Sequence, residues 1–145
     1  MFLGQYTYTL DGKGRLTVPS RFRDELTGNI VVTRGLDRCL TIYPMDVWDE
    51  IAQKVNALPI TDVRGRALRR VFYADAVSAE LDRQGRILIP DRLRDYAGLD
   101  LTGEIVIVGL DRFLEIWGPE RWEEANVRQM EMMDEDPALW ENLQI

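Results

Sequence analysis

The chain has 145 residues, of which 46% are hydrophobic and 30% charged, and these values are typical of one soluble globular domain or of two very small ones that share a core. It contains no histidine, a single cysteine and two lysines, which excludes histidine-dependent catalysis, histidine or cysteine-cluster metal sites and an internal disulfide. The net charge of −7 excludes a uniformly basic DNA-binding surface, and no apolar run is long enough for a signal peptide or a membrane span.

The predicted elements come in two copies. Residues 10–19 (LDGKGRLTVP) align with residues 81–90 (LDRQGRILIP), and the match resumes after a short insertion near residue 100. There TGNIVV and GLDRCLTIY of the first copy face TGEIVI and GLDRFLEIW of the second. The sequence therefore predicts a duplicated, mainly β fold of the α+β class, in which the two copies together form a pseudo-twofold, barrel-like core.

Each copy predicts the same elements in the same order. An extended segment enters a turn, an apolar strand ends at a proline, a short helix follows, and a hairpin and a longer helix close the copy. Ser20 and Asp91 are expected to be the N-caps of the short helices. In chain order the expected segments are 5–10, 15–18, a short helix after Pro19, 30–34 with 39–43, and 45–58, then 76–81, 86–89, a short helix after Pro90, 104–108 with 113–117, and a helix from Pro119.

Four segments follow from this order. We expect a first repeat with its helix at 1–60, a linking helix at 61–74, a second repeat with its helix at 75–133 and a flexible acidic tail at 134–145. The linking helix carries Arg64, Arg66, Arg69 and Arg70. These arginines are interpreted as a solvated face or as partners of the acidic second copy, with contact to another molecule as the alternative.

Both copies share the turn pattern Asp-x-x-Gly-Arg. Its structural explanation is that the aspartate caps the turn and the glycine allows a positive φ. Its functional explanation is that the arginine, which the turn itself does not require, binds phosphate or guanine. The turn-fixing residues are then Asp11, Gly14, Asp82 and Gly85, and the candidate DNA-binding residues are Lys13, Arg15, Arg83 and Arg86.

Other polar and aromatic residues are given structural roles. Asp37-Arg38 and Asp111-Arg112 are interpreted as hairpin turns, and Trp48 and Trp122 as core residues at equivalent places in the two copies. The acidic residues of the last helix are interpreted as a solvated face: Glu120, Glu123 and Glu124.

The chain resembles the MraZ family. The resemblance rests on the start MFLG, the twice-present LDxxGR, the strand-ending Pro19 and Pro90, and the Tyr43-Pro44 and Trp48 segment. It implies two tandem swapped-hairpin repeats of the AbrB/MazE (SpoVT-AbrB) type and DNA binding through the two turns. It also implies a homo-oligomeric ring of roughly eight to twelve subunits.

The role implied by the resemblance is bacterial transcription regulation at the chain's own promoter, upstream of a division and cell-wall gene cluster. We therefore expect a cytoplasmic, nucleoid-associated protein that binds double-stranded DNA, with no catalytic residues, metal or cofactor and no membrane partner. The alternative is a protein-interaction module of the antitoxin or scaffold type that does not bind DNA directly. An enzyme that uses carboxylates is the weakest of the three hypotheses.

Overall fold

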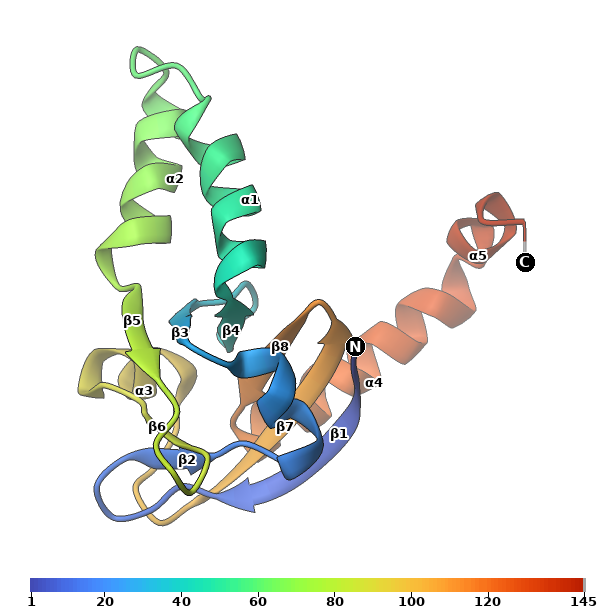
Figure 1. Ribbon diagram of the computed structural model, residues 1–145. Helices are drawn as coiled ribbons and strands as arrows, with labels where there is room; N and C mark the ends of the chain where they lie inside the picture. The colour runs from blue at the N-terminus through green and yellow to red at the C-terminus, as the bar shows by residue number, and fades with distance from the viewer. Residues whose placement is uncertain (145) are drawn as a thin grey trace.

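The computed structural model describes residues 1–144, and Figure 1 shows their arrangement. The first copy contains β1 (Phe2–Thr9), β2 (Arg15–Thr17), η1 (Ser20–Leu26), β3 (Asn29–Arg34), β4 (Leu40–Pro44) and α1 (Met45–Asn56). After α2 (Val63–Ala74), the second copy contains β5 (Val77–Glu80), β6 (Arg86–Leu88), α3 (Asp91–Ala97), β7 (Glu104–Asp111), β8 (Phe113–Trp117), α4 (Pro119–Glu135) and α5 (Ala138–Asn142). No helix in this part of the chain is both long and apolar enough to cross a membrane.

The two copies exchange their first strands. β1 of the first copy pairs antiparallel with β7 of the second, and β5 of the second pairs antiparallel with β3 of the first. The six-stranded sheet has the order β1-β7-β8-β4-β3-β5, which reads the same from either end when equivalent strands are exchanged. This arrangement confirms the predicted α+β class and the pseudo-twofold swapped hairpins.

The core lies between this sheet and the two-stranded ladder of β2 and β6. Equivalent positions of the two copies are buried together, as Leu16 and Ile87 on the ladder and Ile30 and Ile105 on the sheet illustrate. In β2 and β6 only every second side chain is apolar and buried, because side chains of a strand alternate between its faces. The ladder therefore has an inner face that closes the core and an outer face that is open.

Two helical segments project from this body. α1 and α2 form an antiparallel pair that rises from one end, and Trp48 of α1 stacks on Phe72 of α2 with ring centroids 4.2 Å apart. α4 leaves the body in another direction and carries α5 at its far end (Figure 1). The β2–β6 ladder lies at the end of the body opposite the α1–α2 pair.

The structure corrects the expected caps of the short helices. Both helices begin at the residues expected to cap them, so the cap positions are Pro19 and Pro90, and no side chain caps either helix. The first of the two is a 3-10 helix rather than an α-helix. Proline can occupy such a position because its ring fixes its own φ at a value compatible with the start of a helix. The backbone N–H groups that lack an acceptor within the helix belong to the residues that follow it.

The expected tail at 134–145 also contains regular structure. α4 continues to Glu135 and α5 occupies Ala138–Asn142, while residue 145 lies outside the described residues. The flexibility of this segment and the four-part division of the chain stay predictions.

Candidate nucleic-acid interface

The first turn, Asp11 to Arg15, is built around one carboxylate. Asp11 Oδ1 accepts the backbone N–H groups of Lys13 at 2.9 Å and of Arg15 at 2.8 Å, and Asp11 Oδ2 accepts Arg15 Nε at 2.6 Å. Gly14 has φ of +86°, a conformation that glycine adopts without strain. The sequence thus folds locally into a loop that holds the Arg15 guanidinium by one edge.

The second turn, Asp82 to Arg86, repeats this geometry. Asp82 Oδ1 accepts the N–H groups of Gln84 at 2.9 Å and Arg86 at 2.8 Å, and its Oδ2 accepts Arg86 Nε at 2.8 Å. Gly85 has φ of +74°. The same three hydrogen bonds and the same positive glycine φ thus occur in both copies, so the two turns have one geometry.

Both aspartates are held in the ionised form. The backbone N–H of Arg15, followed by its guanidinium and the N–H of Lys13, lowers the pKa of Asp11 to about 2. The equivalent donors, led by the backbone N–H of Arg86, lower the pKa of Asp82. A carboxylate that accepts several hydrogen bonds stays charged at neutral pH and keeps its arginine oriented.

The two arginines share the outer face of the β2–β6 ladder. Arg15 pairs with Leu88 and Thr17 pairs with Arg86 in the antiparallel register, so the four side chains point away from the core. Arg15 and Arg86 are diagonal neighbours in this register, a relation that separates two residues by about 7–8 Å. That separation is close to the rise of two base pairs along one DNA strand, roughly 3.4 Å each.

The arginine groups that face outward have no partner within the described residues. The Asp contacts use Nε, and neither Arg15 nor Arg86 donates a hydrogen bond from its Nη atoms to any group within residues 1–144. About 30% and 28% of the two side chains is exposed. Each guanidinium therefore keeps a pair of N–H donors for a bidentate acceptor.

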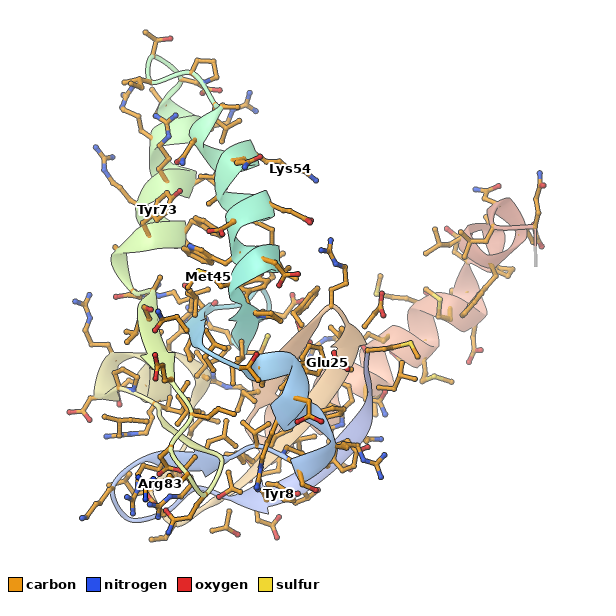
Figure 2. The ribbon with its side chains drawn as sticks, in the orientation of Figure 1. Tyr8, Glu25, Met45, Lys54, Tyr73 and Arg83 are labelled. Carbon is orange, nitrogen blue, oxygen red and sulfur yellow. The ribbon has the colours of Figure 1, made fainter. Side chains whose placement is uncertain are left out.

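The accompanying basic residues occupy different positions in the two turns. The backbone N–H of Lys13 in the first turn and that of Gln84 in the second donate to the same oxygen of the turn aspartate, so these two residues are equivalent. Arg83 is therefore equivalent to Gly12 and not to Lys13. Lys13 and Arg83 are both exposed, and Figure 2 shows Arg83 at the ladder end of the molecule. The two turns therefore share the arginine–aspartate pair, but they carry their additional basic residue, Lys13 or Arg83, at different positions.

Two further arginines join the turns to each other, and sequence reasoning missed them. Arg23 Nε donates to the carbonyl oxygen of Val18 at 3.0 Å and lies against Gly85 of the other copy. Arg94 Nη1 donates to Ile89 O at 2.8 Å and lies against Gly14. We call these two contacts the clasp; the only signal for it in the sequence was that Arg23 and Arg94 align in the repeat.

Most remaining candidates have structural contacts. In α2, Arg66 and Arg69 donate to the backbone carbonyls of Ile60 and Asn56 at 2.9 and 2.8 Å, whereas Arg64 and Arg70 are exposed. Asp37, Arg38, Asp111 and Arg112 lie at the hairpin turns as predicted, and Arg112 also binds Glu50 through two hydrogen bonds. The structure corrects the expected core position of the two tryptophans, because both are only partly buried. Trp122 contacts Trp117 of a small buried cluster, and Trp48 stacks on Phe72 outside the main core.

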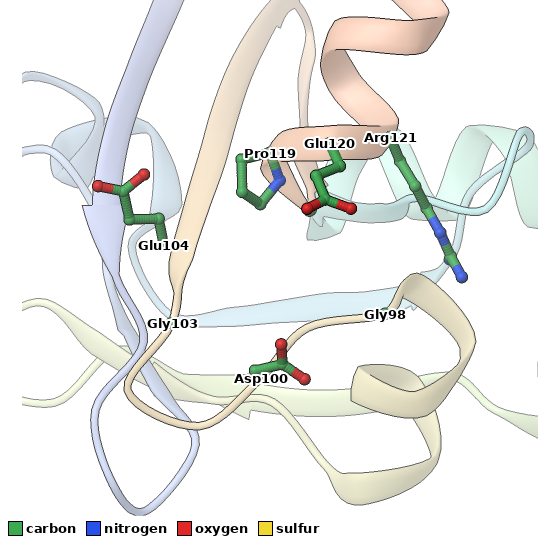
Figure 3. A pocket seen from close by; sticks show the side chains of 8 residues that line it. Gly98, Asp100, Gly103, Glu104, Pro119, Glu120 and Arg121 are labelled. Carbon is green, nitrogen blue, oxygen red and sulfur yellow. The ribbon is translucent and has the colours of Figure 1, made fainter.

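A pocket of about 310 Å³ lies at the start of α4 (Figure 3). Asp100, Glu104 and Glu120 line it, and the one arginine there, Arg121, donates to the carbonyl oxygen of Tyr96 at 2.9 Å. Within residues 1–144 no group of three or more carboxylate or cysteine side chains is arranged to hold a metal ion. Three carboxylates and an arginine that is already hydrogen-bonded give the pocket an acidic lining that does not suit an anion, and the turns remain the candidate site.

Comparison with known proteins agrees with the duplicated architecture. The family model of the MraZ protein, which is described as antitoxin-like, matches residues 1–71 and again residues 72–140. Proteins named transcriptional regulator MraZ are similar over nearly the whole chain. The protein from Thermomicrobium roseum is 53% identical over 84% of both chains, and the one from Herpetosiphon aurantiacus is 48% identical over 99% of this chain and 96% of its own.

Proposed function

The chain belongs to the MraZ family, and from this premise we propose that it is a transcriptional regulator that binds double-stranded DNA through its two turns. The observation that carries the proposal is the pair of equivalent arginines, each oriented by an aspartate and each with free Nη donors on the same outer face. An arginine with two parallel donors matches the O6 and N7 acceptors of guanine and also matches a phosphate.

Each turn residue has a proposed part in this binding. Arg15 and Arg86 contact base edges or phosphates, Lys13 and Arg83 contact the backbone, and Asp11 and Asp82 fix the guanidinium groups. The diagonal spacing across the ladder fits two positions in one groove about two base pairs apart. Because Lys13 and Arg83 occupy different positions in the two turns, we propose that the turns contribute unequally to DNA binding.

The biological setting is proposed on family membership. The regulator acts on repeated boxes in its own promoter, ahead of a division and cell-wall gene cluster, and works in the cytoplasm on the nucleoid. It assembles into a homo-oligomeric ring, in which many modest basic turns act together and offset the net charge of −7. The four-part division of the chain into 1–60, 61–74, 75–133 and 134–145 belongs to the same proposal.

Binding to selected DNA tests the proposal. Repeated selection from random duplexes first yields the bound sequence, and fluorescence anisotropy then compares the wild type with Arg15→Ala, Arg86→Ala and the double variant. Each single change should cost about 1–3 kcal/mol of binding free energy, because one bidentate contact is lost. The wild-type affinity should also fall steeply with salt, with a log–log slope of about 0.9 per phosphate contacted.

The matched control is Arg128→Ala, which removes an exposed arginine of α4 away from the turns. It should leave DNA affinity unchanged, and all variants should keep their thermal stability within about 1 kcal/mol because the lost ion pairs are partly exposed. Failure of selection to enrich any sequence, or equal affinity of the wild type and the double variant, would favour the alternative of a protein-interaction module.

A further inference from the structure

The outer face of the β2–β6 ladder contains an exposed leucine among polar side chains. The outward residues are Arg15 and Thr17 on β2 and Arg86 and Leu88 on β6, because side chains alternate between the two faces of a strand. Leu88 is 53% exposed, whereas its two neighbours in the chain are buried in the core. An apolar side chain thus lies on the surface that the proposed function directs toward DNA.

The fold does not require a leucine at this position. Thr17 occupies the equivalent place in the first copy, on the strand that pairs with β6. Single exposed apolar residues are common on protein surfaces and by themselves indicate no function. Leu88 differs from such residues in its neighbours: Arg15 lies opposite it across the ladder, and Arg86 lies two residues before it on the same strand. These are the two arginines that the turn aspartates orient.

Leu88 lies nearer to Arg15 than to Arg86. Residues directly opposite each other on an antiparallel ladder have Cβ atoms about 4.5–5.5 Å apart, and this is the relation between Leu88 and Arg15. Residues two apart on one strand, as Arg86 and Leu88 are, are separated by about 6.4–6.8 Å. Both separations correspond to one or two base-pair steps of roughly 3.4 Å. A base close to the guanine contacted by Arg15 therefore lies within reach of the leucine.

We propose that Leu88 contacts the C5-methyl group of a thymine one or two base pairs from that guanine, in the major groove. The thymine methyl is an apolar group on the base edges of this groove, and the groove is wide enough for a two-stranded β-ribbon. Leucine has no hydrogen-bond donor for a phosphate oxygen, so its place between the arginines favours base contact over contact with the DNA backbone alone. The inference rests on the proposed DNA binding and adds a second base to those that the ladder distinguishes.

Uracil substitution tests this contact, because uracil lacks the C5-methyl group of thymine and still pairs with adenine. Fluorescence anisotropy measures the affinity of the full-length chain for the selected duplex and for duplexes with uracil at each thymine in turn. Wild-type affinity should fall about fourfold for uracil at a thymine within two base pairs of a guanine, which is the effect of losing one buried methyl group. Leu88→Ala should bind the thymine and uracil duplexes equally. Leu88→Met, which keeps an apolar side chain of similar volume, should retain the difference.

The matched control is Leu139→Ala, which shortens a leucine that is 59% exposed on α5, far from the ladder in Figure 1. It should show the same loss of affinity with uracil as the wild type. Thermal denaturation monitored by circular dichroism should give equal stability for Leu88→Ala and the wild type, because more than half of the Leu88 side chain is exposed.

Two outcomes overturn the inference: no thymine near a guanine is sensitive to uracil, or Leu88→Ala keeps the wild-type sensitivity. Arg15→Ala and Arg86→Ala separate this result from the proposed function. If they lose affinity while Leu88→Ala keeps the wild-type sensitivity, the turns bind DNA and only the leucine contact is wrong. If neither arginine variant loses affinity, the proposed function fails and the leucine contact fails with it.

Discussion

At the scale of single residues, the function proposed for the turns depends on the geometry of an aspartate. Its short side chain lets one oxygen accept backbone N–H groups within the loop while the other accepts the guanidinium four residues on. A glutamate carboxylate would lie one methylene further out, and an asparagine would present only one oxygen. The residue thus fixes both the loop and the direction in which Arg15 points.

The lowered pKa of Asp11 predicts a pH dependence of stability. The pKa falls from 3.8 to about 2 in the folded chain, so the turn's stabilisation is complete above pH 4 and is lost as the pH falls towards 2. Asp11→Asn lacks this titration. Urea unfolding at pH values from 2 to 5 should therefore show a smaller loss of unfolding free energy for Asp11→Asn than for the wild type.

The control for this experiment is Asp24→Asn, which removes an exposed carboxylate without hydrogen bonds among the described residues. Its stability should decline with pH in parallel with the wild type. If Asp11→Asn also declined in parallel, the hydrogen bonds from Arg15 and Lys13 would not stabilise the ionised carboxylate in solution.

At the scale of elements, each turn depends on the arginine of the clasp that covers its glycine. A Cβ at Gly14 would lie 2.0 Å from Arg94 Nη1, and the backbone there has φ of +86°. Gly14→Ala should therefore cost about 1–3 kcal/mol of unfolding free energy through backbone strain and displacement of Arg94. Thermal denaturation monitored by circular dichroism measures this cost.

Gly12 provides the matched control for Gly14. Its nearest atom to an added Cβ is Thr102 Cγ2 at 4.0 Å, and its φ is not positive. Gly12→Ala should leave stability unchanged or raise it by about 0.4–1 kcal/mol, because alanine restricts the unfolded chain. Adding Arg94→Ala to Gly14→Ala should cost less than the two single changes together, since they share one contact. An additive result would contradict the clasp.

Most elements and both turn sites could be predicted from the sequence, because the repeat doubles each local signal. Alternating apolar residues predicted β2 and β6, and the shared Asp and Gly predicted the turns. The clasp could not be predicted, since Arg23 contacts a glycine 62 positions away on the other copy, and no local pattern encodes that contact. The predicted caps of the short helices were wrong. Ser20 and Asp91 are residue types that often cap helices, but the prolines before them occupy the cap positions.

At the scale of the whole molecule, strand exchange makes the two copies one folding unit. β1 and β5 each complete the hairpin of the other copy, and one core contains side chains from both. Neither copy could bury its apolar face alone, since about 50–70 residues support only a marginal core. The turns are therefore held at a fixed separation by the same packing that stabilises the fold.

This interleaving predicts that damage to one copy destabilises both. Leu16→Ala, at a fully buried ladder position of the first copy, should lower the unfolding free energy by about 2–5 kcal/mol. Because unfolding is expected to be a single cooperative transition, amide hydrogen exchange at fixed protein concentration should accelerate in β7 and β8 as much as in β3 and β4. Ile60→Ala, at a position 71% exposed between α1 and α2, should change neither the unfolding free energy nor the exchange rates. Loss of protection in the first copy alone would show that the two copies unfold independently, and the spacing of Arg15 and Arg86 would then no longer follow from a shared core.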